Sequence, residues 1–249
     1  MAVAKRAVQQ VISKNIETKQ SVNKVDTKNI LHNRINIIDS NMFNTTPGTA
    51  DPMTSDVLNR IGDEVNLRGI SLKFLVEQQV YLADVTYRFM IIKSAKGDTP
   101  TDNTLFSGLS GAKIIDQINI ERYTVVFSKT FSLHSRPMVT GNSISGTGLM
   151  LQGSSGPTTG TQLVGGTVAT ELFNAGSRPT RVVKIWIPGK KLFRNGVIKY
   201  ESNSAQTKFF DYHFLCFAYI NSEADSSNSG TVIGGLVKHY YRQMYYKDA

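Results

Sequence analysis

The stretch KIWIPGKKLFRNGVIKY, residues 184–200, alternates apolar and aromatic side chains with cations. It lies within a longer segment, between Glu171 and Glu201, that contains no Asp or Glu. That segment carries seven cations: Arg178, Arg181, Lys184, Lys190, Lys191, Arg194 and Lys199. Because no acid in the segment can pair with them, we expect a polyanion outside the chain to neutralise them.

A second group of cations lies beside aromatic and apolar residues on one face of the predicted strand over 231–246: Lys238, Tyr240, Arg242, Met244 and Tyr246. Lys184 and Trp186 likewise share a face of RVVKIWIP. Bases stack on aromatic rings while cations neutralise phosphates, so this pattern is typical of single-stranded nucleic-acid binding. The same aromatics can instead pack in a core, with the cations reaching past them to solvent, and the sequence does not decide between these readings.

The residue types that most often perform catalysis do not form a cluster in this sequence. Cys216 shares a strand face with Tyr212 and Phe214 in YHFLCFAYI, so we expect a buried apolar thiol, and His213 points to the opposite face. The other histidines, His32, His134 and His239, fall in separate predicted strands or strand ends, away from metal-ligand spacing. No nucleotide-binding glycine motif is complete. We therefore expect a protein that is not an enzyme and that has no metal and no cofactor.

The composition points to the same class of partner. The 28 Lys and Arg exceed the 19 Asp and Glu, which gives a net charge of +9. Such a balance favours a nucleic acid or an acidic membrane surface as the partner. No run approaches the ~18 consecutive apolar residues of a membrane span. The first residues lack the apolar run of a secretory signal, so we expect intracellular synthesis.

More than half of the net charge lies in residues 1–34, where two acids accompany seven cations: Lys5, Arg6, Lys14, Lys19, Lys24, Lys28 and Arg34. This segment has no aromatic residue, and polar residues dominate it. We expect residues 1–29 to form a basic N-terminal arm, mobile or partly helical, whose cations contact nucleic acid.

From residue 30 onward the apolar residues recur with a period of two, as in Ile70, Leu72, Phe74 and Val76. Two more sets share one side of a strand: Val85, Tyr87, Phe89 and Ile91, and then Val125, Phe127, Phe131 and Leu133. This pattern predicts eight strands, over 33–39, 65–78, 84–93, 123–133, 181–188, 196–200, 208–220 and 231–246. No long amphipathic helix is available to connect parallel strands, so we expect antiparallel sheets. The fold class is thus all-β: residues 30–249 form one eight-stranded jelly-roll sandwich.

Residues 138–177 differ from the rest. They hold nine of the 20 glycines, many Ser and Thr, and Glu171 as their only charge. Such a segment cannot build its own core. We expect either a flexible insertion between strands or a loop ordered by neighbouring subunits.

The chain resembles the capsid proteins of circular, Rep-encoding single-stranded DNA viruses, the circovirus-like group. The likeness rests on three stretches: RIGDEVNLRGISLKFLVE with the following VTYRFMIIK, then VKIWIPGKKLFRNGVIKYES, and the closing HYYRQMYYKDA. Together they span residues 60–249 in order. The arm departs from that family's pattern, because it has scattered lysines in place of a dense arginine run.

The resemblance implies a capsid protein that assembles with copies of itself into an icosahedral shell and packages single-stranded DNA by sequence-independent electrostatic contacts. It also implies a virion protein made in the host cytoplasm, with or without import into the nucleus. Small RNA viruses share the jelly roll and the basic arm, so RNA remains an alternative cargo. The other alternative is a cellular jelly-roll module that binds nucleic acid or carbohydrate as a small oligomer.

Overall fold

The computed structural model describes residues 19–47, 60, 62–79, 82, 84–108, 112–134, 142–143, 167–168, 179–221 and 232–248. Its strands are β1 (Lys19–Leu31), β2 (Asn36–Asp39), β3 (Glu64–Gln78), β4 (Asp84–Ala95), β5 (Thr124–His134), β6 (Asn142–Ser143), β7 (Thr167–Val168), β8 (Thr180–Pro188), β9 (Val197–Lys199), β10 (Phe210–Ile220) and β11 (Ile233–Asp248). Two short helical turns, α2 (Gly189–Leu192) and η1 (Arg194–Gly196), follow β8. Within these ranges no helix has the length and apolar character needed to cross a membrane.

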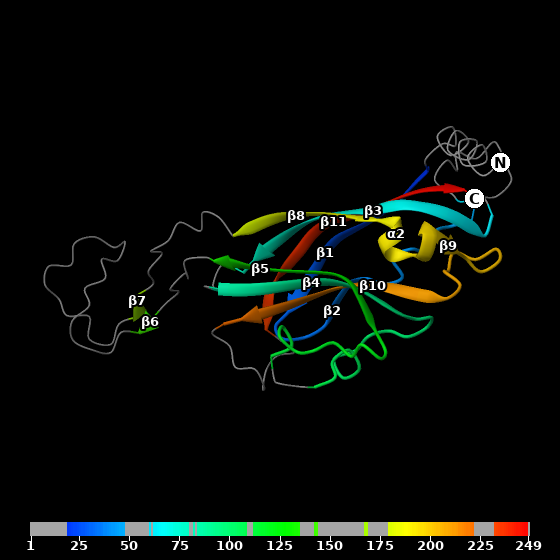
Figure 1. The fold of residues 1–249 in the computed structure, drawn as a ribbon. Coiled ribbons are helices and arrows are strands. Elements are labelled where there is room, and N and C mark those ends of the chain that lie inside the picture. The colour runs from blue at the N-terminus through cyan, green and yellow to red at the C-terminus, as the bar shows by residue number, and fades with distance from the viewer. Residues whose placement is uncertain are drawn as a thin grey trace, which may run out of the picture.

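The main strands form two antiparallel sheets that face each other (Figure 1). Sheet A has the order β1-β11-β3-β8, and β9 also pairs with β3. Sheet B has the order β2-β10-β4-β5, while β6 and β7 pair only with each other. The predicted all-β class and the antiparallel pairing are therefore confirmed.

The core between the sheets contains the apolar faces that the period of two predicted. Ile70, Leu72, Phe74 and Val76 of β3 are all buried there, as are Val85, Tyr87, Phe89 and Ile91 of β4. The prediction for β5 is wrong at Val125, which is 38% exposed. A bulge in the pairing of β4 with β5 shifts the register at this point, so that Val126 replaces Val125 beside Phe127 and packs against the core.

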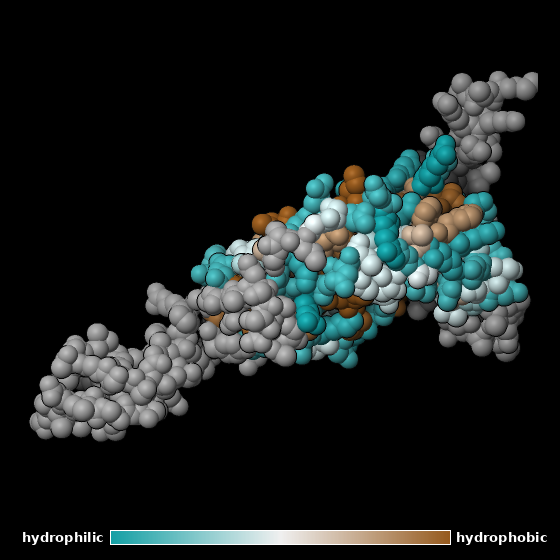
Figure 2. Space-filling model, turned by 90° about the horizontal axis from the view of Figure 1, so that it is seen from below, coloured by the Kyte–Doolittle hydropathy of each residue, from teal (hydrophilic) through white to brown (hydrophobic). Residues whose placement is uncertain are grey.

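Among the described residues, apolar clusters cover both faces of sheet B but only the inner face of sheet A. A second apolar cluster joins the outer face of β4 and β10 to the connection that follows β4, with Leu105, Phe106 and Ile118 as its buried members from that connection. This explains the continuous apolar runs of β4 and β10, because a strand buried on both faces has no polar face. The surface seen from below is mostly hydrophilic, with isolated hydrophobic residues (Figure 2).

The expected N-terminal arm is wrong in its boundary. Residues 19–29 belong to β1, which pairs with β11 from Lys19 to Leu31. The remainder of the arm, residues 1–18, lies outside the described residues. Most of the 138–177 segment also lies outside them, apart from the short β6 and β7.

Candidate nucleic-acid interface

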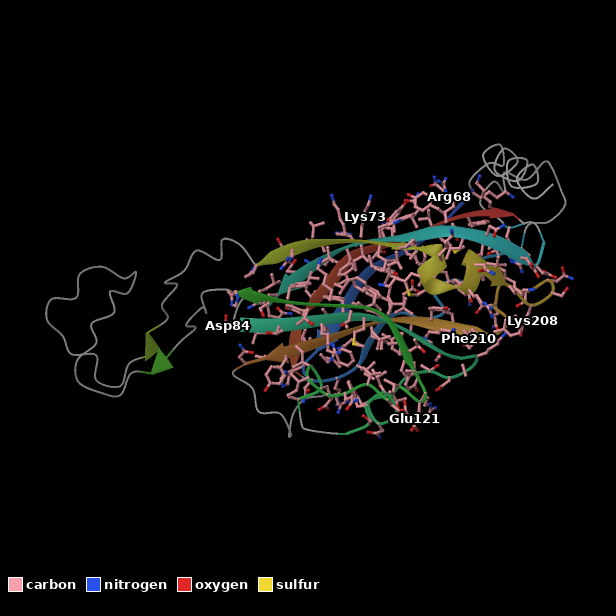
Figure 3. The ribbon with its side chains drawn as sticks, viewed as in Figure 1. Arg68, Lys73, Asp84, Glu121, Lys208 and Phe210 are labelled. Carbon is pink, nitrogen blue, oxygen red and sulfur yellow. The ribbon has the colours of Figure 1, made fainter. Side chains whose placement is uncertain are left out.

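The outer face of sheet A carries side chains that alternate with those of the core. In β8, Val183, Ile185 and Ile187 are buried, so the intervening Lys184 and Trp186 point outward and are exposed. Lys73 of β3 is exposed for the same reason, between buried Leu72 and Phe74. Figure 3 shows Lys73 and Arg68 pointing away from the sandwich on this side.

A row of cations crosses this face from one sheet edge to the other. Lys24 of β1 is paired with Tyr241 of β11, Tyr241 with Lys73, and Lys73 with Lys184 of β8. Lys24 lies 3.4 Å from Asp26, in an ion pair that is largely exposed to solvent. Among the described residues, neither Lys73 nor Lys184 has an acid within ion-pair distance. Two opposed lysines without a shared acid repel each other and favour an anion above the sheet.

An aromatic pair lies next to the row. Trp186 is 56% exposed, and its ring centroid lies 5.6 Å from that of Tyr245 of β11. The indole reaches Tyr245 by passing over Gly69 of β3, where an added Cβ would lie 2.4 Å from the ring carbon Cζ2. The missing side chain of Gly69 therefore lets the ring lie close to the sheet, with its exposed part available to a base.

Four of the five candidate residues of β11 are not on this face, because Tyr240, Arg242, Met244 and Tyr246 are all buried. Arg242 is 6% exposed, lies 3.3 Å from the Asp39 carboxylate, and donates to the carbonyl of Met42. It is a buried pairing residue, and its assignment to nucleic-acid binding is wrong. Tyr240 and Tyr246 are fully buried and pack in the core.

The physical reason is a bulge in β11. The register with β3 shifts between Lys238 and Tyr241, and His239 has a φ of 52°. The bulge separates Lys238 from the face that the period of two assigned to it, and Lys238 forms an ion pair of 2.6 Å with buried Glu77. The same shift turns Tyr241 and Tyr245 outward, two residues that the sequence did not indicate as candidates.

The other predicted cations are spread over the molecule. Lys28 donates to the carbonyls of Ile37 and Ile38, which ties β1 to β2. Lys199 forms a 2.6 Å ion pair with Glu64. Lys19 of β1 lies opposite Tyr246 of β11, and Arg34 is exposed in the turn before β2. Lys190, Lys191 and Arg194 are exposed on α2 and η1, while Lys5, Arg6 and Lys14 lie outside the described residues.

The residues considered for catalysis, Cys216 and His213, are buried in the interior of the protein. Cys216 is fully buried in the core, as predicted, and burial raises the pKa of its thiol, which opposes nucleophilic chemistry. His213 is also buried, and burial lowers the pKa of its imidazole. In the part of the chain that the structure describes, no group of three or more His, Cys, Asp or Glu side chains is arranged to hold a metal ion.

No protein-family model matches the sequence, and no curated protein matches it at a significant level.

Proposed function

We propose that this chain is a viral capsid subunit with a jelly-roll fold, which binds single-stranded DNA through the outer face of sheet A. The strand order supports the jelly roll. Along the chain, β1, β3, β8 and β11 enter one sheet, and β2, β4, β5 and β10 enter the other. This interleaving is what two Greek keys folded into one sandwich produce.

The main support for nucleic-acid binding is that Lys73 and Lys184 lie directly opposite each other on β3 and β8, beside exposed Trp186. Like charges placed directly across two strands destabilise a sheet, so their presence is accounted for by a bound anion. The rings of Trp186 and Tyr245, whose planes are tilted by 60° to each other, add aromatic faces on which bases of any sequence can stack. A polyanion with unpaired bases, which is a single-stranded nucleic acid, satisfies both features.

Self-assembly is supported by exposed apolar residues on separate parts of the surface. Ile115 and Ile120 are 74% and 76% exposed in the connection before β5, and Val182 is 62% exposed on β8. A subunit in a closed symmetric shell has several neighbours and can bury apolar residues on several sides. The three stretches that carry the family resemblance include β3 with β4, the segment from β8 to β9, and β11.

The alternative function is a cellular nucleic-acid-binding module that forms small oligomers. Negative-stain microscopy of the purified protein separates the two proposals. Uniform closed particles are the result expected for a capsid subunit. Monomers or small oligomers at every salt concentration and pH would contradict the capsid proposal. Sequencing the nucleic acid that copurifies with the particles distinguishes DNA from RNA cargo.

A further inference from the structure

A cavity of about 470 Å³ opens at the end of the sandwich that carries α2, η1 and β9. It lies between η1 and the start of β10, and Lys93 of β4 contributes to its wall. Figure 3 shows Phe210 at this end, away from Lys73 on the outer face of sheet A. Neither Trp186 nor Lys184 lines it, so the cavity is separate from the proposed interface.

Part of the cavity wall is an exposed aromatic surface. Phe209 and Phe210 are adjacent residues that remain 55% and 41% exposed. Exposure of two neighbouring phenyl rings leaves apolar area in water, which a flat apolar ligand would remove. Buried Tyr212 extends the same wall inward, and its hydroxyl already donates to the carbonyl of Leu192.

The polar part of the wall is positively charged. Among the described residues of the lining, Glu64 is the only acid, and it neutralises Lys199 in an ion pair. Arg194 is exposed, and Lys93 holds its ammonium 3.6 Å from the centroid of the Phe210 ring. Neither Arg194 nor Lys93 forms an ion pair with any described residue. The cavity therefore offers two cations next to an aromatic surface.

We propose that this cavity binds a nucleotide, with the base against Phe210 and Phe209 and the phosphate near Arg194 and Lys93. Aromatic rings stack on bases, and a guanidinium donates to two phosphate oxygens at once. Asn195, also in the lining, carries a side-chain amide that makes no hydrogen bond with the described residues and can pair with the edge of a base. The nucleotide is either free or one unstacked unit of a bound strand. The proposal does not require the protein to form a shell.

The test uses the full chain and isothermal titration calorimetry with AMP, adenosine and inorganic phosphate as separate probes. AMP is expected to bind at least tenfold more tightly than either fragment, since only AMP carries both base and phosphate. Arg194→Gln should weaken AMP about tenfold and leave adenosine unchanged. Phe210→Leu, a change at a partly exposed position, should weaken both by a similar factor. Arg122→Gln, which removes an exposed arginine outside both the cavity and the predicted nucleic-acid contacts, is the matched control.

An oligonucleotide arm distinguishes the two sources of the nucleotide. If Arg194→Gln also weakens a thymidine oligonucleotide, the ligand is a unit of a bound strand; if it weakens AMP alone, the ligand is a free nucleotide. AMP that fails to bind, or that binds equally well to folded Arg194→Gln and Phe210→Leu proteins, would overturn the proposal whatever the oligonucleotide does. Thermal unfolding of each variant establishes that it is folded.

Discussion

Lys73 and Lys184 occupy directly opposed positions on β3 and β8, and both side chains are exposed on the outer face of sheet A. Opposed residues of antiparallel strands have Cβ atoms about 5 Å apart, so the two ammonium groups repel each other in the unbound protein. The repulsion lowers the free energy of unfolding, while the same two charges raise the affinity for an anion. This relationship makes the two properties separable by mutation.

Replacement of both residues, Lys73→Gln with Lys184→Gln, should therefore change stability and binding in opposite directions. The free energy of unfolding should rise by a few tenths of a kcal/mol to about 1 kcal/mol, because the repulsion is removed. Affinity for single-stranded nucleic acid should fall at moderate salt. The slope of log affinity against log salt should become shallower by up to about 1.4, since each phosphate contact on a single strand contributes about 0.7.

Urea unfolding and fluorescence anisotropy with a labelled oligonucleotide measure the two effects. Lys208→Gln is the control, because Lys208 is an exposed cation outside the row across sheet A. A double variant whose salt slope equals that of the parent would show that this face does not contact nucleic acid.

Trp186 supplies a direct optical test of the same face. It is the only tryptophan in the chain and is more than half exposed. Fluorescence excited at 295 nm, which selects tryptophan over tyrosine, therefore reports on this position alone. Stacking of a base on the indole should quench the emission when an oligonucleotide is added, and Trp186→Phe should weaken binding less than Trp186→Ala. AMP should leave the emission unchanged, because Trp186 does not line the cavity beside Phe210. Saturating oligonucleotide without any change in emission would place the bound strand elsewhere.

The core faces were predictable from sequence because the period of two is local. Ile70 and Leu72 in β3, and Tyr87 and Phe89 in β4, follow it without interruption. β1 escaped prediction because Ile30 is its only fully buried apolar residue. Its other residues are half-buried or exposed, and the strand is held by its backbone pairing with β11, which a polar sequence does not indicate.

The interface was only partly predictable, since it depends on register. The exposure of Lys184 and Trp186 follows from alternation within β8. Their neighbours Lys73 and Tyr245 are more than 50 residues away in the chain and become neighbours only through strand pairing. The bulge at His239 turns Arg242 toward the core. The extra residue of a bulge cannot be predicted from the local alternation of apolar and polar residues.

Truncation at the N-terminus tests the position of β1. Deletion of residues 1–28 removes most of β1 and leaves the edge of β11 unpaired, so it should lower the unfolding temperature and promote aggregation. Deletion of residues 1–18 removes Lys5, Arg6 and Lys14 but no part of β1, and it should leave the unfolding temperature close to that of the parent. Thermal unfolding followed by circular dichroism, with light scattering for aggregation, compares the two. Equal unfolding temperatures for both deletions would contradict the pairing of β1 with β11.

His213 should make the stability of the subunit depend on pH. Its side chain is 2% exposed, and Nε2 lies 3.2 Å from the Ser94 hydroxyl and 3.3 Å from the carbonyl oxygen of Asp98. Burial lowers the pKa of the imidazole below its ordinary value of 6.5. The unfolded chain therefore binds this proton more readily than the folded one does. The contribution to the free energy of unfolding is fully present above pH 6.5 and is lost as the pH falls from 6.5 through the lower folded pKa.

Free energies of unfolding, measured by urea titration between pH 8 and pH 5, should show this loss. Their slope should be at most about 1.4 kcal/mol per pH unit for one proton. His213→Gln should lower stability at every pH, because the residue is buried, and should flatten the curve below pH 6.5. His134→Gln is the matched control, since His134 is an exposed histidine of β5. The Asp98 carboxylate does not interfere, because its hydrogen bond from Arg122 lowers its pKa below 3.8, outside this range. A His213→Gln curve that runs parallel to that of the parent would show that another group causes the pH dependence.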